Sequence, residues 1–144
     1  MKKLDEKIYL FTKELEAIQG IISRKSSHCF LVKGWAISLV FASFLFDATG
    51  AQIFLAFFPL LAFWYLDAFF SREVKMFKIL HGWVSKNRMK TDRYFFDLDP
   101  EKRFKKEIPS VLSLMFTPSI FYVYGIMFIL ILGFIAVNNC WILI

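Results

Sequence analysis

The chain has 144 residues, of which 58% are hydrophobic and 19% aromatic, and its formal net charge is +6. Soluble domains average about 45–50% apolar residues, so this composition excludes an ordinary soluble domain and indicates an all-α integral membrane protein. The two cysteines and two histidines are not spaced like metal ligands, so the sequence predicts neither a metal site nor a cofactor.

Residues 1–27 predict an amphipathic helix with an apolar stripe in heptad spacing. The stripe consists of Leu4, Ile8, Phe11, Leu15, Ile18 and Ile22. Because it covers fewer than three heptads, it is too short to predict a coiled coil by itself. We predict that these six side chains seam subunits together in a homo-oligomer. Packing on another helix of the same chain, or on the bilayer surface, are the alternatives.

Residues 28–70 predict a transmembrane helical hairpin. Its two apolar segments, Cys29–Phe46 and Ile53–Phe70, have 18 residues each, which is short but sufficient to span a bilayer. Gly50 marks the expected turn at residues 47–52. Pro59 falls within the second segment, where it predicts a bend in the helix.

Lys33 and Asp67 are charged residues inside the two apolar segments of the hairpin. Lys33 lies 17 residues before Gly50 and Asp67 lies 17 residues after it, so an antiparallel hairpin brings both to one depth. Charges inside spans usually pair or extend to the headgroups. We predict a structural ion pair that closes the hairpin. Independent snorkelling of both side chains, or a role as gate charges, are the alternatives.

Residues 71–107 predict a basic helical segment outside the bilayer, with 11 Lys and Arg against six acids. The helical pattern continues to about Arg88. It then breaks, with a turn at Asp99–Pro100 and a short helix at about 101–107.

The basic residues of this segment alternate with aromatic ones, a mixture that suits a phosphate polyanion such as a nucleotide or DNA oligomer. The candidate ligand-binding residues are Arg72, Lys75, Lys78, Lys86, Arg88, Arg93 and Arg103. Contact with anionic lipid, which is the default for such a segment, and binding of an acidic protein are the alternatives.

Residues 108–144 contain no Lys, Arg, His, Asp or Glu over 37 positions. This run exceeds the roughly 20 residues that one span needs. Pro118 divides it into an interfacial segment at 108–117 and a third transmembrane helix at 118–144. A re-entrant segment at 108–117 is the alternative.

The basic residues predict the orientation of the three spans. Every Lys and Arg except Lys33 lies in residues 1–27 or 71–107, so both segments are expected in the cytoplasm and the C-terminus outside. Cys29 and Cys140 then lie on opposite sides of the membrane. Neither a nucleophile motif nor a phosphate-binding glycine loop occurs, so we expect no enzymatic activity.

Two stretches resemble a family of small bacterial membrane proteins with KGW and WxLDA motifs. The matching residues are Ile18, Gln19, Ile21, Arg24, Phe30, Leu31, Lys33, Gly34, Trp35, Phe63, Trp64, Leu66, Asp67 and Ala68. The stretches, 17–42 and 58–84, cover about half of the chain. Through them the chain is similar to the membrane effectors of the Hailong antiphage defence system.

The resemblance implies an oligomeric ion channel in the bacterial inner membrane. It also implies a cytoplasmic DNA-oligomer ligand made by a partner nucleotidyltransferase, and depolarisation of infected cells. No DNA-contact motif can be matched residue by residue. A membrane adaptor that recruits a protein partner through its basic cytoplasmic face is the alternative function.

Overall fold

The computed structural model describes residues 2–45, 56–91 and 95–142, and the side chains of 4–45, 56–91 and 95–137. The predicted turn at 47–52, the candidate ligand residue Arg93 and the side chain of Cys140 lie outside these ranges. The described residues form five helices and no strand, which confirms the all-α prediction. The helices are α1 (Lys2–Leu45), α3 (Phe57–Asn87), α4 (Pro100–Phe104), α5 (Val111–Met115) and α6 (Pro118–Ile142).

Helix α1 is one uninterrupted helix of 44 residues, about 66 Å long at 1.5 Å per residue. It joins the predicted amphipathic helix to the first predicted span without a break. No proline occurs in its sequence, and a glycine inside a helix, such as Gly20 or Gly34, costs only about 1 kcal/mol. Residues 2–27 and 28–45 therefore share one axis.

Helix α3 begins at Phe57 and ends at Asn87, one residue before the predicted end. Pro59 is its third residue, which corrects the prediction that this proline bends the helix. The amide hydrogens of a first helical turn have no intrahelical acceptor, so a proline there removes no hydrogen bond and needs no kink.

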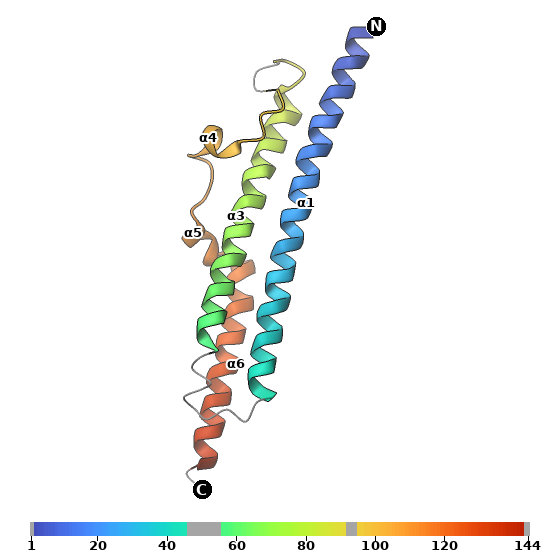
Figure 1. Cartoon of the computed structure of the whole chain (residues 1–144). Helices are drawn as coiled ribbons and strands as arrows, with labels where there is room; N and C mark the ends of the chain where they lie inside the picture. The colour runs from blue at the N-terminus through green and yellow to red at the C-terminus, as the bar shows by residue number, and fades with distance from the viewer. Residues whose placement is uncertain (1, 46–55, 92–94, 143–144) are drawn as a thin grey trace.

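Helices α1 and α3 run side by side over most of their length, and α6 joins them along the lower half of the molecule (Figure 1). We call residues 2–28 of α1, residues 71–87 of α3 and the four residues that follow α3, 88–91, the stalk. We call residues 29–45 of α1, 57–70 of α3 and the whole of α6 the base. Helices α4 and α5 lie beside α3 on the side away from α1 (Figure 1).

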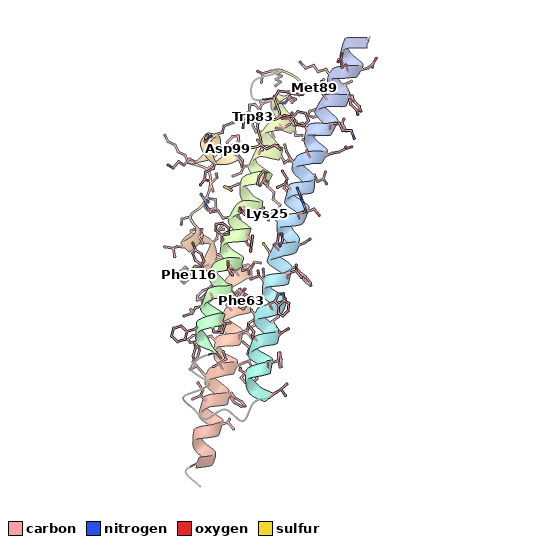
Figure 2. All side chains as sticks on the ribbon, in the orientation of Figure 1. Lys25, Phe63, Trp83, Met89, Asp99 and Phe116 are labelled. Atoms are coloured by element: carbon pink, nitrogen blue, oxygen red, sulfur yellow. The ribbon has the colours of Figure 1, made fainter. Side chains whose placement is uncertain are left out.

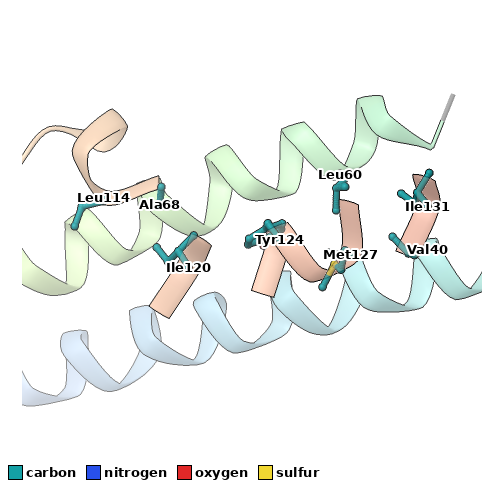
Figure 3. Close-up of a cluster of buried hydrophobic side chains, with 9 residues drawn as sticks. Val40, Leu60, Ala68, Leu114, Ile120, Tyr124, Met127 and Ile131 are labelled. Carbon is teal, nitrogen blue, oxygen red and sulfur yellow. The ribbon is translucent and has the colours of Figure 1, made fainter. Parts of the chain in front are cut away.

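The base has a hydrophobic core to which all three helices contribute (Figure 3). Its members include Ala36 and Val40 from α1, Leu60 from α3, and Tyr124 and Ile131 from α6. These side chains fill the space between the helices.

The stalk has a second, smaller core, which corrects the prediction for the heptad stripe. Ile18 is fully buried against Leu80 and Val84 of α3, and Phe11, Leu15 and Ile22 pack around them. The stripe is covered within the chain because α3 continues beyond the base and lays its own apolar face on it. Only Leu4 and Ile8 of the six stripe residues remain largely exposed, at 55% and 45%. The other four, which we predicted to contact a second subunit, pack against α3 of the same chain.

Helices α4 and α5 are one-turn elements in the segment that returns from the stalk to the base. Pro100 starts α4, and the hydroxyl of Ser110 caps α5 by accepting a hydrogen bond from the amide of Ser113 at 3.1 Å. The indole nitrogen of Trp64 donates to the carbonyl of Met115 at 3.1 Å, which fixes α5 to α3.

Two of the described helices are long and apolar enough to cross a membrane, namely α1 within Leu4–Leu45 and α6 at Pro118–Val137. The described apolar part of α3, from Phe57 to Phe70, is only 14 residues long. The first part of the second predicted span, Ile53–Leu55, lies outside the described residues.

Candidate functional site

An ion pair joins α1 to α3 inside the base. The ammonium nitrogen of Lys33 lies 2.7 Å from Oδ1 of Asp67, and these are the two partners that the sequence predicts. The side chain of Asp67 is fully buried, whereas that of Lys33 is 26% exposed. The partly exposed ammonium of Lys33 thus stabilises the fully buried carboxylate of Asp67.

More polar groups surround this ion pair. One turn further up, the thiol of Cys29 lies 3.7 Å from the hydroxyl of Ser71. From α6, the hydroxyl of Tyr124 donates to the carbonyl of Phe63 at 3.2 Å. Within the described residues, Oδ2 of Asp67 is buried and has no hydrogen-bond partner. All three helices of the base thus bring polar groups to one level, and Asp67 retains an unused acceptor there.

A second ion pair lies deep in the upper stalk, between Glu14 of α1 and Arg88 at the end of α3. The guanidinium donates to both carboxylate oxygens through Nε and Nη2. The two side chains are 1% and 2% exposed. A buried bidentate pair of this kind stabilises the fold only while both partners are present.

Aromatic rings enclose the Arg88 guanidinium. Its carbon lies 5.7 Å from the Trp83 ring centre and 5.4 Å from that of Phe95, within the range of cation–π attraction. The amide of Phe96 donates to Glu14 at 3.2 Å, and Phe96 adopts a φ of 53° in the left-handed region. Figure 2 marks this part of the stalk by Trp83 and Met89. The ion pair therefore also holds the segment that follows α3.

Sequence reasoning missed the role of Glu14, although a signal existed. Glu14 lies three residues after Phe11 and four before Ile18, so it falls on the apolar stripe itself. A carboxylate at that position has to find a buried cation once another helix covers the stripe.

The structure divides the seven predicted polyanion ligands into groups. Arg88 is buried, which corrects its assignment to a surface site. Arg72 pairs with Glu101 at 2.9 Å, and Arg103 pairs with Asp97 at 2.8 Å, so acids already neutralise both. The hydrogen bond from Arg103 lowers the pKa of Asp97. Lys75, Lys78 and Lys86 are exposed on α3.

These three lysines and Lys90 form what we call the lysine face. None of the four makes an ion pair within the part of the chain that the structure describes. The acids of α3 are used elsewhere, because Asp67 pairs with Lys33 and Glu73 pairs with Lys25 at 2.7 Å. Gly82 lies between Lys78 and Lys86, and a Cβ added there would meet no atom within 4 Å. The lysine face is therefore open and uniformly positive.

No family model, no curated protein and no solved structure matches this chain. Among the described residues, no group of three or more His, Cys, Asp or Glu side chains is arranged to hold a metal ion.

Proposed function

We propose that the chain is a three-span membrane protein of the bacterial inner membrane with its base in the bilayer and its stalk in the cytoplasm. Only 17% and 22% of the most apolar stretches of α1 and α6 are buried within the chain. The core helix of a soluble protein would be mostly buried, so uncovered apolar helices favour a lipid environment. The concentration of Lys and Arg in the stalk and its return segment favours its cytoplasmic location.

Helix α3 contributes the second span of this arrangement. Its only charged residue between Phe57 and Phe70 is Asp67, and Lys33 neutralises it. The pair lies toward the stalk end of the base, where the partly exposed ammonium of Lys33 can reach the headgroups. Helix α5 follows at the same end. Leu112 within it and Phe116 directly after it are exposed, which suits an interfacial segment.

The function that we assign to this base is ion conduction by a ring of copies. The observation that carries it is that the core fills the middle of a three-helix base while most of the apolar surface is uncovered. One copy encloses no path, so a path has to lie between copies. The exposed side of α6 bears Ser119, Tyr122 and Ile126, and side chains of this kind suit a pore with a hydrophobic constriction.

The lysine face is the proposed site of a gating polyanion. Lys75 lies five residues beyond Phe70, about 7.5 Å along the helix, whereas Lys86 lies about 24 Å beyond it. The headgroup layer is only about 5–8 Å thick on each side. Lipid headgroups reach Lys75 but not Lys86, so a phosphate polyanion that stands away from the membrane suits the whole lysine face better.

A role in antiphage defence, with a DNA oligomer supplied by a partner nucleotidyltransferase, rests on the sequence resemblance alone. We keep it as the biological context of the proposed channel.

Ion flux tests the channel. Purified protein is reconstituted in liposomes that hold a potassium gradient, and a potential-sensitive dye is read with and without a single-stranded oligonucleotide. We expect flux that the oligonucleotide changes. A variant with Lys75, Lys78 and Lys86 changed to Gln should conduct but ignore the oligonucleotide. Liposomes that stay polarised under every condition would refute conduction.

The lysine face also supports a second candidate, a membrane adaptor that binds an acidic protein. A chain that carries no current, yet captures an acidic protein through Lys75, Lys78 and Lys86, would be such an adaptor.

A further inference from the structure

An apolar groove of about 370 Å³ runs between α3 and α6 in the base. Its walls include Leu60, Leu61 and Trp64 from α3, with Tyr124, Gly125 and Phe128 from α6. No residue of α1 lines this groove. We call it the α3–α6 groove, and its size falls in the range of cavities that hold a ligand or an inserted side chain.

The register of α1 against α3 gives the depth of this groove. Cys29 lies beside Ser71 and Lys33 lies beside Asp67, so the residue numbers of facing positions add up to about 100. Residues 35–41 of α1 are therefore level with residues 59–65 of α3. The groove thus lies level with the part of α1 around Ser38.

At this level α1 presents an outward ridge of Trp35, Ser38 and Phe41, which lie three residues apart along one row of the helix. Trp35 and Phe41 are 64% and 58% exposed, whereas Ala36 and Val40 on the opposite side of α1 are buried. Gly34 lies beside the ridge, with open space where a Cβ would be. We call these three residues the α1 ridge.

The exposed area of the chain leaves room for contacts between copies. The chain exposes 10045 Å². A compact monomer of 17.0 kDa exposes only about 7,700 Å². The excess of about 2,300 Å² exceeds the roughly 1,600 Å² that a ring subunit buries in two standard interfaces of about 800 Å² each.

We propose that the α1 ridge of one copy docks in the α3–α6 groove of the next copy. This interface rests on the proposed membrane orientation, because rotation about an axis normal to the bilayer keeps every residue at its depth. A ridge and a groove that face different directions at one depth fit a head-to-tail contact, and such contacts close into rings. In such a ring, the exposed side of α6 faces the centre.

Two glycines of α6 provide a matched test of the groove. Gly125 lines it and Gly133 does not, and a Cβ at either position meets no atom within 4 Å. Leu is a better helix former than Gly, so neither Gly125→Leu nor Gly133→Leu should prevent folding. Gly125→Leu fills the groove and should lower the oligomeric fraction at least tenfold, whereas Gly133→Leu should leave it unchanged. Native mass spectrometry from detergent micelles measures both.

Equal oligomeric fractions in the two variants would overturn the interface, whether both stay assembled or both fall apart. Unchanged assembly of Gly125→Leu would mean that a lipid acyl chain, rather than a neighbouring copy, occupies the groove.

Crosslinking tests the direction of the contact. In a background with Cys29→Ser and Cys140→Ser, the pair Ser38→Cys with Gly125→Cys should give a ladder of disulfide-linked copies in membranes. The pair Ser38→Cys with Gly133→Cys should give at least tenfold less. Equal yields would overturn the docking. Neither the oligomeric fraction nor the disulfide yield depends on ion flux. The tests of the interface and of ion conduction can therefore fail independently.

Discussion

At the scale of single residues, two of the ion pairs between helices, Lys33–Asp67 and Glu14–Arg88, differ in how far their side chains are exposed. Glu14 and Arg88 are both buried, whereas Lys33 is partly exposed and its partner Asp67 is not. Removing one member of a buried pair typically costs about 3–5 kcal/mol, because the other charge stays in a poorly solvating environment. The exposure of each partner therefore decides which substitution is the more harmful.

For the base, we expect Lys33→Met to destabilise the protein more than Asp67→Leu. Lys33→Met leaves a fully buried carboxylate without a cation, whereas after Asp67→Leu the ammonium of Lys33 can turn toward the headgroups. The double variant should recover most of the lost stability. Thermal unfolding in detergent gives the three values, and a double variant that loses as much stability as the two single variants together would contradict coupling between the two side chains.

For the stalk, we expect Glu14→Leu and Arg88→Met to cost about 3–5 kcal/mol each, and the double variant to cost much less than their sum. Loss of Glu14 also releases the amide of Phe96, so the segment after α3 should exchange its amide hydrogens faster. Chemical denaturation and hydrogen exchange of the full chain measure these effects. Additive costs in the cycle would contradict a direct interaction.

At the scale of elements, the sequence predicts helix ends well where local signals exist. Pro118 begins α6, and α3 ends one residue from the predicted position because the apolar periodicity stops there. The sequence does not predict in the same way which surface covers the α1 stripe. The stripe requires an apolar cover, and only the three-dimensional course of α3 decides that this cover comes from the same chain.

The Lys33–Asp67 pair could be predicted because equal distances from a turn locate both residues at one depth. Arg88 could not be separated from its exposed neighbours, since a basic residue at the end of a helix looks the same in sequence whether it faces solvent or Glu14. Three of the seven predicted residues, Lys75, Lys78 and Lys86, therefore remain in the proposed surface site, and Lys90 joins them. Only the fold distinguishes these lysines from the paired arginines.

The two ends of the α1 stripe should respond differently to truncation. Ile18 is fully buried, so Ile18→Ala should cost about 2–5 kcal/mol of stability through the cavity that it leaves. Ile8 is 45% exposed, and Ile8→Ala should cost less than about 1 kcal/mol. Because the stripe packs within the chain, neither change should alter the subunit number. Denaturation and native mass spectrometry of both variants check this, and a loss of oligomers in Ile18→Ala without unfolding would restore the stripe as a subunit seam.

At the scale of the whole molecule, the proposed contacts between copies lie in the base, whereas the proposed ligand site lies in the stalk. The proposed ring contacts lie at the depth of Ser38 and Leu60, whereas the lysine face begins at Lys75, beyond the base. The stalk core and the Glu14–Arg88 pair hold α1 against α3 alongside the lysine face. A ligand on α3 therefore acts on the helix that also forms one wall of the groove.

Polyanion binding at the lysine face should depend on salt in proportion to the lysines that it uses. Each phosphate contact contributes about 0.7 to the slope of log K against log salt for a single strand. Changing Lys75, Lys78 and Lys86 to Gln should therefore flatten the slope by about 2 for a short oligonucleotide.

The matched control, with Lys102, Lys105 and Lys106 changed to Gln, removes the same charge from α4 and the turn after it. That control should flatten the slope by well under 1, because charges that do not contact the oligonucleotide act on it only through a screened field. Fluorescence anisotropy of a labelled oligonucleotide between about 50 and 200 mM salt measures all three proteins. Equal changes in both triple variants would mean that net charge, rather than the lysine face, holds the ligand.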